Sequence, residues 1–146
     1  TKVGAILSNV KNKEKEALEF YGRNLGLTFQ IADDTLDYNS ELKIFGKKIG
    51  QDFYEGKITL PIILLFQQAE EKEKEKLKNI FVKEKKTEDE LNYTLSLIKN
   101  YNIIKACYQK AQHYINLASN SLSVFSNSEE KNILENLTSF SLSRNF

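Results

Sequence analysis

Residues 29–61 read FQIADDTLDYNSELKIFGKKIGQDFYEGKITLP, and this stretch decides both the fold and most of the functional interpretation. Acidic groups come first, at Asp33, Asp34 and Asp37. Two glycine–lysine pairs follow, at Gly46-Lys47 and Gly56-Lys57. Carboxylates that hold Mg²⁺ commonly share it with phosphate oxygens. This order of acid and base therefore favours a site for a metal ion and a polyanion.

Helix geometry supports that interpretation. Asp33 and Asp37 are four residues apart, so a helix would project both from one face, with Cβ atoms roughly 5–6 Å apart. Two carboxylates at this spacing repel each other unless water solvates them or a cation compensates them. Lys47 and Lys57 would then neutralise the phosphate, and the glycine beside each lysine would let backbone approach a ligand closely.

The motifs of this stretch, taken together, resemble a known family. They are Phe29-Gln30, Asp33-Asp34-x-x-Asp37, Gly46-Lys47-x-x-Gly50-x-Asp52 and Glu55-Gly56-Lys57-x-Thr59-Leu60-Pro61. They resemble the second aspartate-rich region of the trans-isoprenyl diphosphate synthases, or polyprenyl synthetases. The EGKxTLP ending is more similar to long-chain members, such as octaprenyl and solanesyl diphosphate synthases, than to short-chain farnesyl enzymes.

The resemblance covers essentially the whole chain, but it corresponds to roughly the C-terminal half of a full enzyme. It implies an all-α fold, the C-terminal portion of an isoprenoid-synthase-type helical bundle, with residues 1–146 as a single domain. It also implies Mg²⁺-dependent condensation of isopentenyl diphosphate with an allylic diphosphate, in which metals and basic groups stabilise the leaving diphosphate.

The resemblance also assigns roles to individual residues. Asp33 is the expected direct Mg²⁺ ligand, with Asp34 and Asp37 as a second ligand or as water-holding groups. Gln30 and Lys47 match positions that contact the allylic substrate and its diphosphate, and Phe29 would line the cavity for the growing chain. Asp52 and Lys57 match positions near the metal–diphosphate cluster. No residue of the chain is assigned as a catalytic acid, base or nucleophile.

One departure from the family pattern is decisive. A complete member has a first aspartate-rich motif followed by an arginine pair, and neither occurs here; the arginines are Arg23 and Arg144. We therefore expect the chain alone to be inactive and to need the N-terminal half of a synthase, covalently or from a homologous subunit. The family is typically dimeric, so the complete enzyme is expected to be a homo-oligomer.

Other kinds of protein share parts of this pattern. A non-catalytic or regulatory subunit, or a decayed fragment, would share the fold, although such chains often lose the aspartates that are intact here. A terpene cyclase would carry an NDxxSxxxE-type motif after Asp37, and none is present. An EF-hand fails because Tyr38 or Leu42 stands where its loop needs glycine. A plain helical interaction domain leaves the combined motif unexplained.

Composition narrows the remaining function classes. Of 146 residues, 40% are hydrophobic and 28% charged, which is ordinary for a globular domain, and the net charge of +1 gives no basic field for nucleic acid. A single cysteine, Cys107, fits a reducing compartment, and we expect a cytoplasmic location. The longest apolar run, residues 58–66, is far shorter than the roughly 20 residues of a membrane span. No signal peptide is expected, and the chain reads as part of a longer protein.

Apolar periodicity predicts helices almost throughout. The expected helical ranges are 3–10, 13–38, 61–69, 103–125 and 128–142, and a further helix is expected to open at Thr87, with Leu91, Leu95 and Ile98 on one face. The first aspartates fall at a helix C-terminus, where partial negative charge disfavours them. Residues 39–56 are expected to form a loop, and residues 70–78 a solvated, charged helix start or surface loop.

Helix starts and isolated reactive residues complete these expectations. Thr59 is a plausible N-cap, and Pro61 suits the first turn of a helix whose apolar surface implies burial on every side. Thr87 and Glu90 match a capping box. Cys107 is expected in the core and His113 on the surface, since neither has a partner at metal-ligand spacing.

Overall fold

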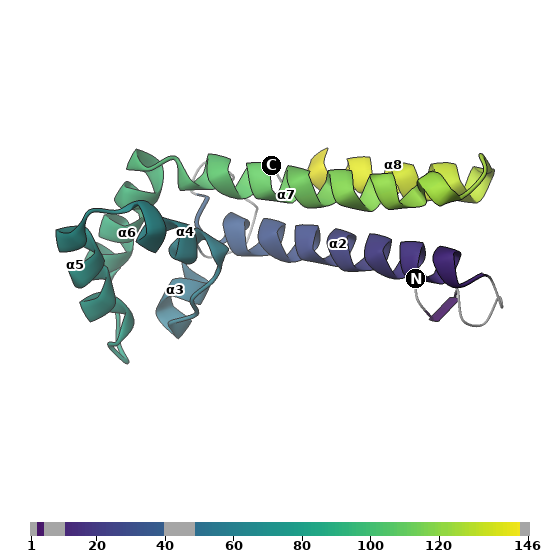
Figure 1. The fold of residues 1–146 in the computed structure, drawn as a ribbon. Helices are drawn as coiled ribbons and strands as arrows, with labels where there is room; N and C mark the ends of the chain where they lie inside the picture. Colours follow the sequence, from purple (N-terminus) through teal and green to yellow (C-terminus); the bar gives the residue numbers. More distant parts are fainter. Residues whose placement is uncertain (1–2, 5–10, 40–48, 144–146) are drawn as a thin grey trace. The chain divides into compact units, whose positions relative to one another are not determined.

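The computed structural model describes residues 3–4, 11–39 and 49–143, and every described regular element is helical (Figure 1). The all-α prediction is therefore confirmed. The α-helices are α2 (Asn12–Leu36), α3 (Gln51–Glu55), α4 (Leu60–Gln68), α5 (Glu71–Phe81), α6 (Glu88–Asn100), α7 (Ile103–Ser121) and α8 (Glu129–Ser143). A short 3₁₀ helix, η1 (Leu122–Val124), follows α7.

The chain divides into two compact units. Unit 1 comprises residues 1–32 and 109–146, and unit 2 comprises residues 33–108. The boundary falls within the two long helices α2 and α7.

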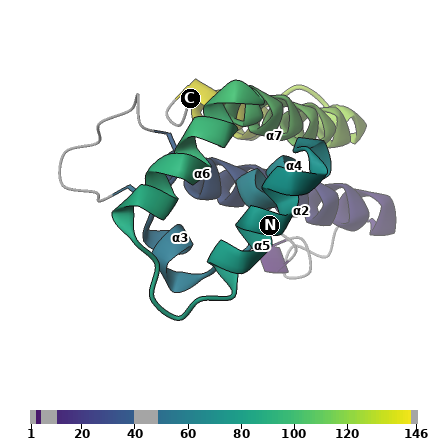
Figure 2. The same ribbon diagram turned by 90° about the vertical axis from the view of Figure 1, so that its left-hand side faces the viewer.

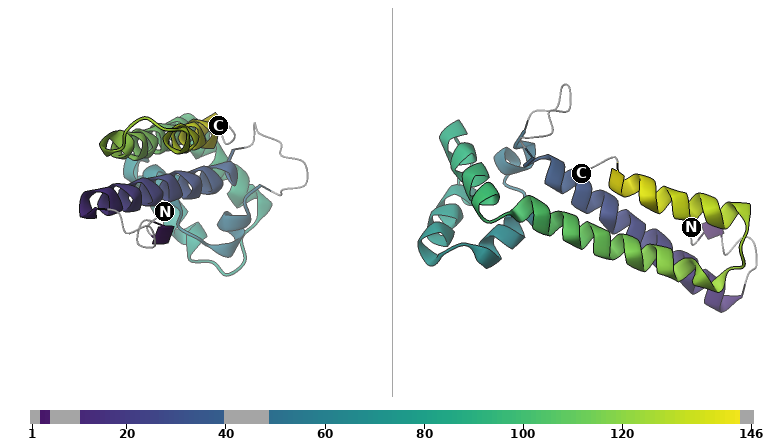
Figure 3. Two further views of the ribbon diagram at one scale, coloured as in Figure 1. Left: turned by 90° about the vertical axis from the view of Figure 1, so that its right-hand side faces the viewer. Right: turned by 90° about the horizontal axis from the view of Figure 1, so that it is seen from above.

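Unit 1 contains three long helical segments lying side by side, from α2, α7 and α8 (Figure 3). Its buried core joins α2 to α7 and η1 through Tyr21, Leu25, Ile115, Ala118 and Leu122, with Leu18, Phe125 and Leu134 packed against it. Burying each large apolar side chain of this kind contributes roughly 1.5–3 kcal/mol. The Tyr21 hydroxyl, buried with its ring, donates to the carbonyl oxygen of Leu134 at 2.9 Å and so fixes α8 on the core.

Unit 2 gathers the short helices α3 to α6 (Figure 2). Phe53 of α3 is fully buried, and its ring meets that of Phe81 edge to face at 5.4 Å between centroids. Phe66 of α4 approaches the same Phe81 ring at 6.4 Å. Aromatic packing thus holds α3 and α4 on the end of α5, which places the segment that follows α3.

Most predicted helices are confirmed, with boundaries shifted by a few residues. The charged helix start that was one of the two expectations for residues 70–78 is confirmed, because α5 begins there with a capping box between Glu70 and Glu73. The loop expected over residues 39–56 is interrupted by α3, whose five residues are too few to give a periodic signal. The helix expected over residues 3–10 lies mostly outside the described residues.

The burial of individual side chains agrees with expectation in part. Burial of the first α4 turns on every side is wrong: Ile62, Leu64 and Leu65 are buried, but Ile63 is 41% exposed, because α4 presents one face to solvent. Cys107 is fully buried and His113 is exposed, as expected. None of the described helices combines the length and apolar character that crossing a membrane requires.

Candidate functional site

The acidic end of α2 carries the first two aspartates. Asp33 is exposed and Asp34 is only 9% exposed, and both lie in the last turn of the helix. No basic residue occupies that turn. The partial negative charge of a helix C-terminus therefore adds to the two carboxylates, and this end of α2 is a favourable place for a cation.

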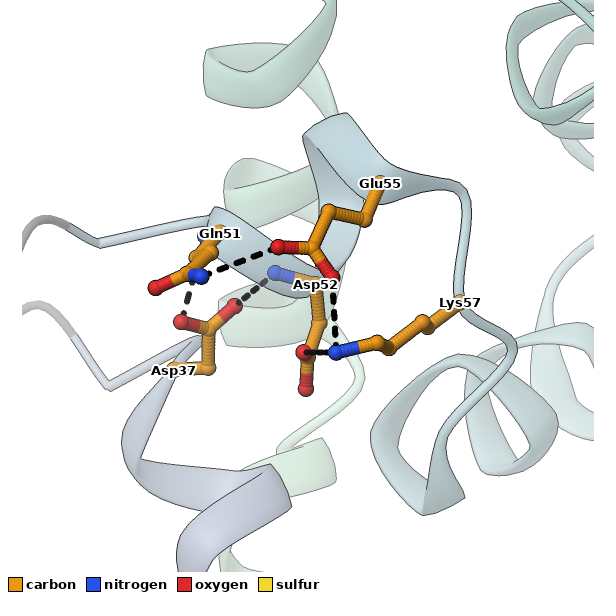
Figure 4. Close-up of polar contacts among 5 residues, drawn as sticks. All are labelled: Asp37, Gln51, Asp52, Glu55 and Lys57. Atoms are coloured by element: carbon orange, nitrogen blue, oxygen red, sulfur yellow. Dashed lines mark hydrogen bonds and ion pairs between the residues drawn. The ribbon is translucent and has the colours of Figure 1, made fainter.

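Asp37 lies one residue beyond α2 and has a different environment. It is 4% exposed, and its two carboxylate oxygens accept the backbone N–H groups of Gln51 at 3.1 Å and Asp52 at 2.9 Å (Figure 4). The carbonyl oxygen of Asp37 accepts the N–H of Gly50 at 2.9 Å. The expectation that Asp33 and Asp37 project from one helix face is not met, because α2 ends first and Asp37 turns to the start of α3.

Gly50 makes this arrangement possible. It is the N-cap of α3 with φ +83°, a conformation that disfavours side chains, and it has no side chain with which to cap the helix itself. A Cβ atom at this position would lie 2.7 Å from the side chain of Leu91. Asp37 therefore supplies the missing cap and ties the aspartate motif to the second half of the motif region.

Lys57 follows α3 and lies between two carboxylates. Its Nζ is 2.7 Å from Glu55 Oε2 and 3.1 Å from Asp52 Oδ1 (Figure 4). Glu55 and then Asp52 raise the pKa of the Lys57 amine above its usual range, and Lys57 in turn lowers the pKa of Glu55. The Lys57 side chain is 55% exposed, so solvent screens these pairs. A fully charged ammonium group is thus held at the surface.

The motif region also contains a buried tyrosine, Tyr38, and a buried hydroxyl, that of Thr59. Tyr38 is 2% exposed, and burial, followed by the charges of Asp37 and Asp52, raises the pKa of its hydroxyl. By distance and angle, neither the Tyr38 hydroxyl nor the buried Thr59 Oγ1 makes a hydrogen bond with a described residue, although the Thr59 side chain acts on Tyr38 and opposes part of the rise in its pKa. Thr59 is the N-cap of α4, but its side chain makes no capping hydrogen bond.

The remaining predicted site residues are less constrained. Phe29 and Gln30 lie on α2, and both are exposed, Phe29 by 40%. Lys47 lies outside the described residues. The structure thus brings together Asp37, Asp52 and Lys57, while the roles of all the predicted site residues stay predictions.

Two residues that complete the site, Gln51 and Glu55, have no role assigned from the sequence motifs. Gln51 Nε2 donates to Glu55 Oε1 at 2.9 Å, and this contact orients the carboxylate that holds Lys57. Their four-residue spacing was the available signal, because it places both side chains on one face of a helix. That signal applies only if the segment is helical, and the glycines on both sides of α3 favoured a loop instead.

The carboxylates do not form a closed metal cage. Among the described residues, no group of three or more acidic, histidine or cysteine side chains is placed to hold a metal ion. Mg²⁺ commonly binds through one or two carboxylates, several waters and substrate phosphates. An exposed Asp33 beside a nearly buried Asp34 fits an ion that arrives with a diphosphate.

Comparison with protein families gives a match over most of the chain. The family model described as polyprenyl synthetase matches residues 1–98. A short chain isoprenyl diphosphate synthase of Methanothermobacter thermautotrophicus is 33% identical over 99% of this chain and 44% of its own length. Solanesyl-diphosphate synthase 2 of Oryza sativa subsp. japonica is 32% identical over 99% of this chain and 34% of its own length.

Solved structures give the same result. A decaprenyl diphosphate synthase from Rhodobacter capsulatus superposes with a TM-score of 0.91 at 29% identity, covering 100% of this chain and 45% of that one. A polyprenyl synthase from Caulobacter crescentus, in complex with calcium and isoprenyl diphosphate, gives 0.87 at 34% identity, covering 99% and 44%. The chain spans less than half the length of these proteins and matches their C-terminal part.

Proposed function

The chain belongs to the polyprenyl synthetase family, and we propose that it supplies the second aspartate-rich half-site of a Mg²⁺-dependent prenyl chain elongation reaction. The reaction would condense isopentenyl diphosphate with an allylic diphosphate. The observation that carries the proposal is the junction at Asp37, where hydrogen bonds join the acidic end of α2 to the helix that precedes Lys57. Acidic and basic groups of the motif region are thereby parts of one local structure.

Each group of the junction suits a separate task. Asp33, which is exposed, would contact the cation directly, while Asp34 and Asp37 would hold its water ligands. Asp37 can do so although both its oxygens accept N–H groups, since an ionised carboxylate offers about four lone-pair sites. When bound, Mg²⁺ would neutralise charge on the leaving diphosphate.

Lys57 would bind the diphosphate in place of one of its present carboxylate partners. Its ammonium group already has two anionic partners, Glu55 and Asp52, at the protein surface. Surface pairs of this kind are worth little in free energy, so a diphosphate oxygen can replace a carboxylate at small cost. Lys47 would bind the same anion, and Phe29 and Gln30 would contact the allylic substrate.

The half-site is proposed to be inactive without the remainder of a synthase. Relatives are more than twice as long as the chain. The exposed face of α8 supports the need for a partner, since Ile133, Leu137 and Phe140 follow a helical spacing and are 59%, 38% and 55% exposed. That partner is the N-terminal half of a synthase or a homologous subunit, and the complete assembly is proposed to be a dimer in the cytoplasm.

The test is a prenyltransferase assay with Mg²⁺, radiolabelled isopentenyl diphosphate and farnesyl diphosphate. The chain is assayed alone and mixed with the separately expressed N-terminal part of the M. thermautotrophicus relative. We expect activity only in the mixture, and a loss of at least a hundredfold in Asp33→Ala because a direct metal contact is removed. Asp89→Ala, an exposed aspartate in the first turn of α6, is the matched control and should retain activity.

The alternative is a non-catalytic or regulatory subunit, or a decayed fragment, of a prenyltransferase. A regulatory subunit would be supported if the mixture shows no prenyltransferase activity and the chain changes the rate or the product length of an intact synthase. Robust condensation by the chain alone would refute the half-site proposal.

A further inference from the structure

Glu55 carries a negative charge that its own helix does not need. It is the last residue of α3, and no basic residue lies in the last turn of that helix. A helix C-terminus has partial negative charge, so a carboxylate at this end is disfavoured. A local rule broken in this way is expected where a side chain serves a site.

The two carboxylate oxygens of Glu55 have different partners (Figure 4). Oε1 accepts a side-chain N–H of Gln51, one helical turn earlier, at 2.9 Å. Oε2 lies 2.7 Å from Nζ of Lys57. The contact with Gln51 does not depend on Lys57, so the carboxylate can leave the ammonium group and still keep one hydrogen bond.

The other carboxylate partner of Lys57 is held more firmly. The side chain of Asp52 is 18% exposed, against 44% for Glu55. The backbone N–H of Asp52 is also fixed by Asp37 at 2.9 Å. Leaving a less exposed carboxylate without its cation costs more than returning an exposed one to water. Of the two carboxylates, Glu55 is therefore the one that an incoming anion displaces more easily.

The charges around Lys57 favour displacement over simple addition. An ammonium group has three N–H donors, and that of Lys57 already faces two carboxylates. A diphosphate at the third donor would lie beside both negative charges, and like charges this close repel each other. Displacing Glu55 removes one of these repulsions and leaves Lys57 with Asp52 and the diphosphate.

We propose that Glu55 is a tethered competitor for the diphosphate: its carboxylate occupies Lys57 before the diphosphate binds and is then displaced, still bonded to Gln51. No covalent bond breaks and no proton moves in this exchange. Glu55 thereby lowers the affinity of the site for the anion without touching the reacting atoms. The inference rests on the proposed function, because it takes Lys57 as a ligand of the diphosphate.

The test measures binding of inorganic pyrophosphate, in the presence of Mg²⁺, to the whole 146-residue chain by isothermal titration calorimetry. Glu55→Gln removes the charge but keeps an oxygen that can accept the N–H of Gln51. Exposed ion pairs form with equilibrium constants of about 1.4 to 5, so removing a tethered competitor should tighten binding about two- to sixfold. Glu71→Gln is the matched control, because Glu71 pairs with Lys74 at 2.9 Å on α5, and it should bind as the unaltered chain does.

A second comparison separates competition from simple repulsion. Removing the charge of Glu55 also weakens the repulsion of the anion, and that effect does not need Lys57. We therefore expect Glu55→Gln to tighten binding less in a Lys57→Gln background than in the presence of Lys57. Equal gains in the two backgrounds would show that Glu55 acts by repulsion alone, and would overturn the competitor role.

The remaining outcomes distinguish this inference from the proposed function. Pyrophosphate binding by the unaltered chain, with unchanged or weaker binding by Glu55→Gln, would overturn the competitor role and leave the half-site proposal standing. Absence of pyrophosphate binding by every variant would also overturn the competitor role, and the half-site would then be decided by the prenyltransferase assay of the mixture. Urea denaturation of each variant verifies that folded chains are compared.

Discussion

Two helices of unit 2 begin in contrasting ways. α6 is capped by its own sequence: Thr87 Oγ1 accepts the N–H of Glu90 at 3.3 Å, and Glu90 Oε2 accepts the N–H of Thr87 at 2.9 Å. α3 begins at a glycine and is capped from 14 and 15 positions away by Asp37. The local cap serves only its helix, whereas the remote cap also joins the two halves of a candidate site.

This contrast explains why a short helix stands in the middle of the motif region. Five residues cannot form a stable helix by themselves, because nucleation is unfavourable. The carboxylate of Asp37 compensates by satisfying two N–H groups at the positive end of α3. The geometry that presents Lys57 therefore depends on an aspartate that family resemblance assigns to the metal.

The largest effect should come from removing the remote cap. Asp37→Ala leaves the N–H groups of Gln51 and Asp52 without their charged acceptor, and hydrogen bonds to charged groups contribute about 1.5–3 kcal/mol each. We expect a loss of about 3 kcal/mol in the free energy of unfolding, measured by urea denaturation. Hydrogen exchange of the α3 amides should accelerate in the same variant.

Asp33→Ala is the control for that experiment. It removes a carboxylate from the same motif, but an exposed one in the last turn of α2. Surface substitutions away from special features usually change stability by less than about 0.5 kcal/mol. Equal stability losses in the two variants would show that Asp37 has no special role in holding α3.

A smaller effect should follow from giving the start of α3 a side chain. Gly50→Ala must adopt φ +83° and must displace the side chain of Leu91, and we expect a loss of about 2 kcal/mol in the free energy of unfolding. Gly26→Ala, inside α2 where an added Cβ meets nothing within 4 Å, should instead stabilise the chain by about 0.5–1 kcal/mol. A neutral Gly50→Ala would contradict the described turn.

The same contrast separates what the sequence could predict from what it could not. The capping box at Thr87, the helix start near Pro61 and the long helices depend on neighbours within about four residues, and all were predicted and confirmed. The α3 helix was missed because its stabilising partner is remote in sequence. Spacing rules carry no information about a carboxylate that turns away from its own helix.

The same distinction between local and remote contacts applies to the candidate site. Aspartates and lysines could be named from their order, but the pairing of Lys57 with both Glu55 and Asp52 needed the α3 turn. Thr59 was predicted as an N-cap from its residue type, and the position is confirmed. The missing capping bond could not be foreseen, because residue type and spacing do not say which way a threonine hydroxyl turns.

The smallest effect should appear at the two threonine N-caps, and it tests the contrast most directly. Thr87→Val removes a hydroxyl that caps α6, so it should cost about 1 kcal/mol and speed hydrogen exchange of the Glu90 amide. Thr59→Val removes a hydroxyl that makes no capping bond, so exchange in the first turn of α4 should stay unchanged. If α4 frays as α6 does, the Thr59 hydroxyl is an ordinary cap after all, and the contrast between the two helix starts fails.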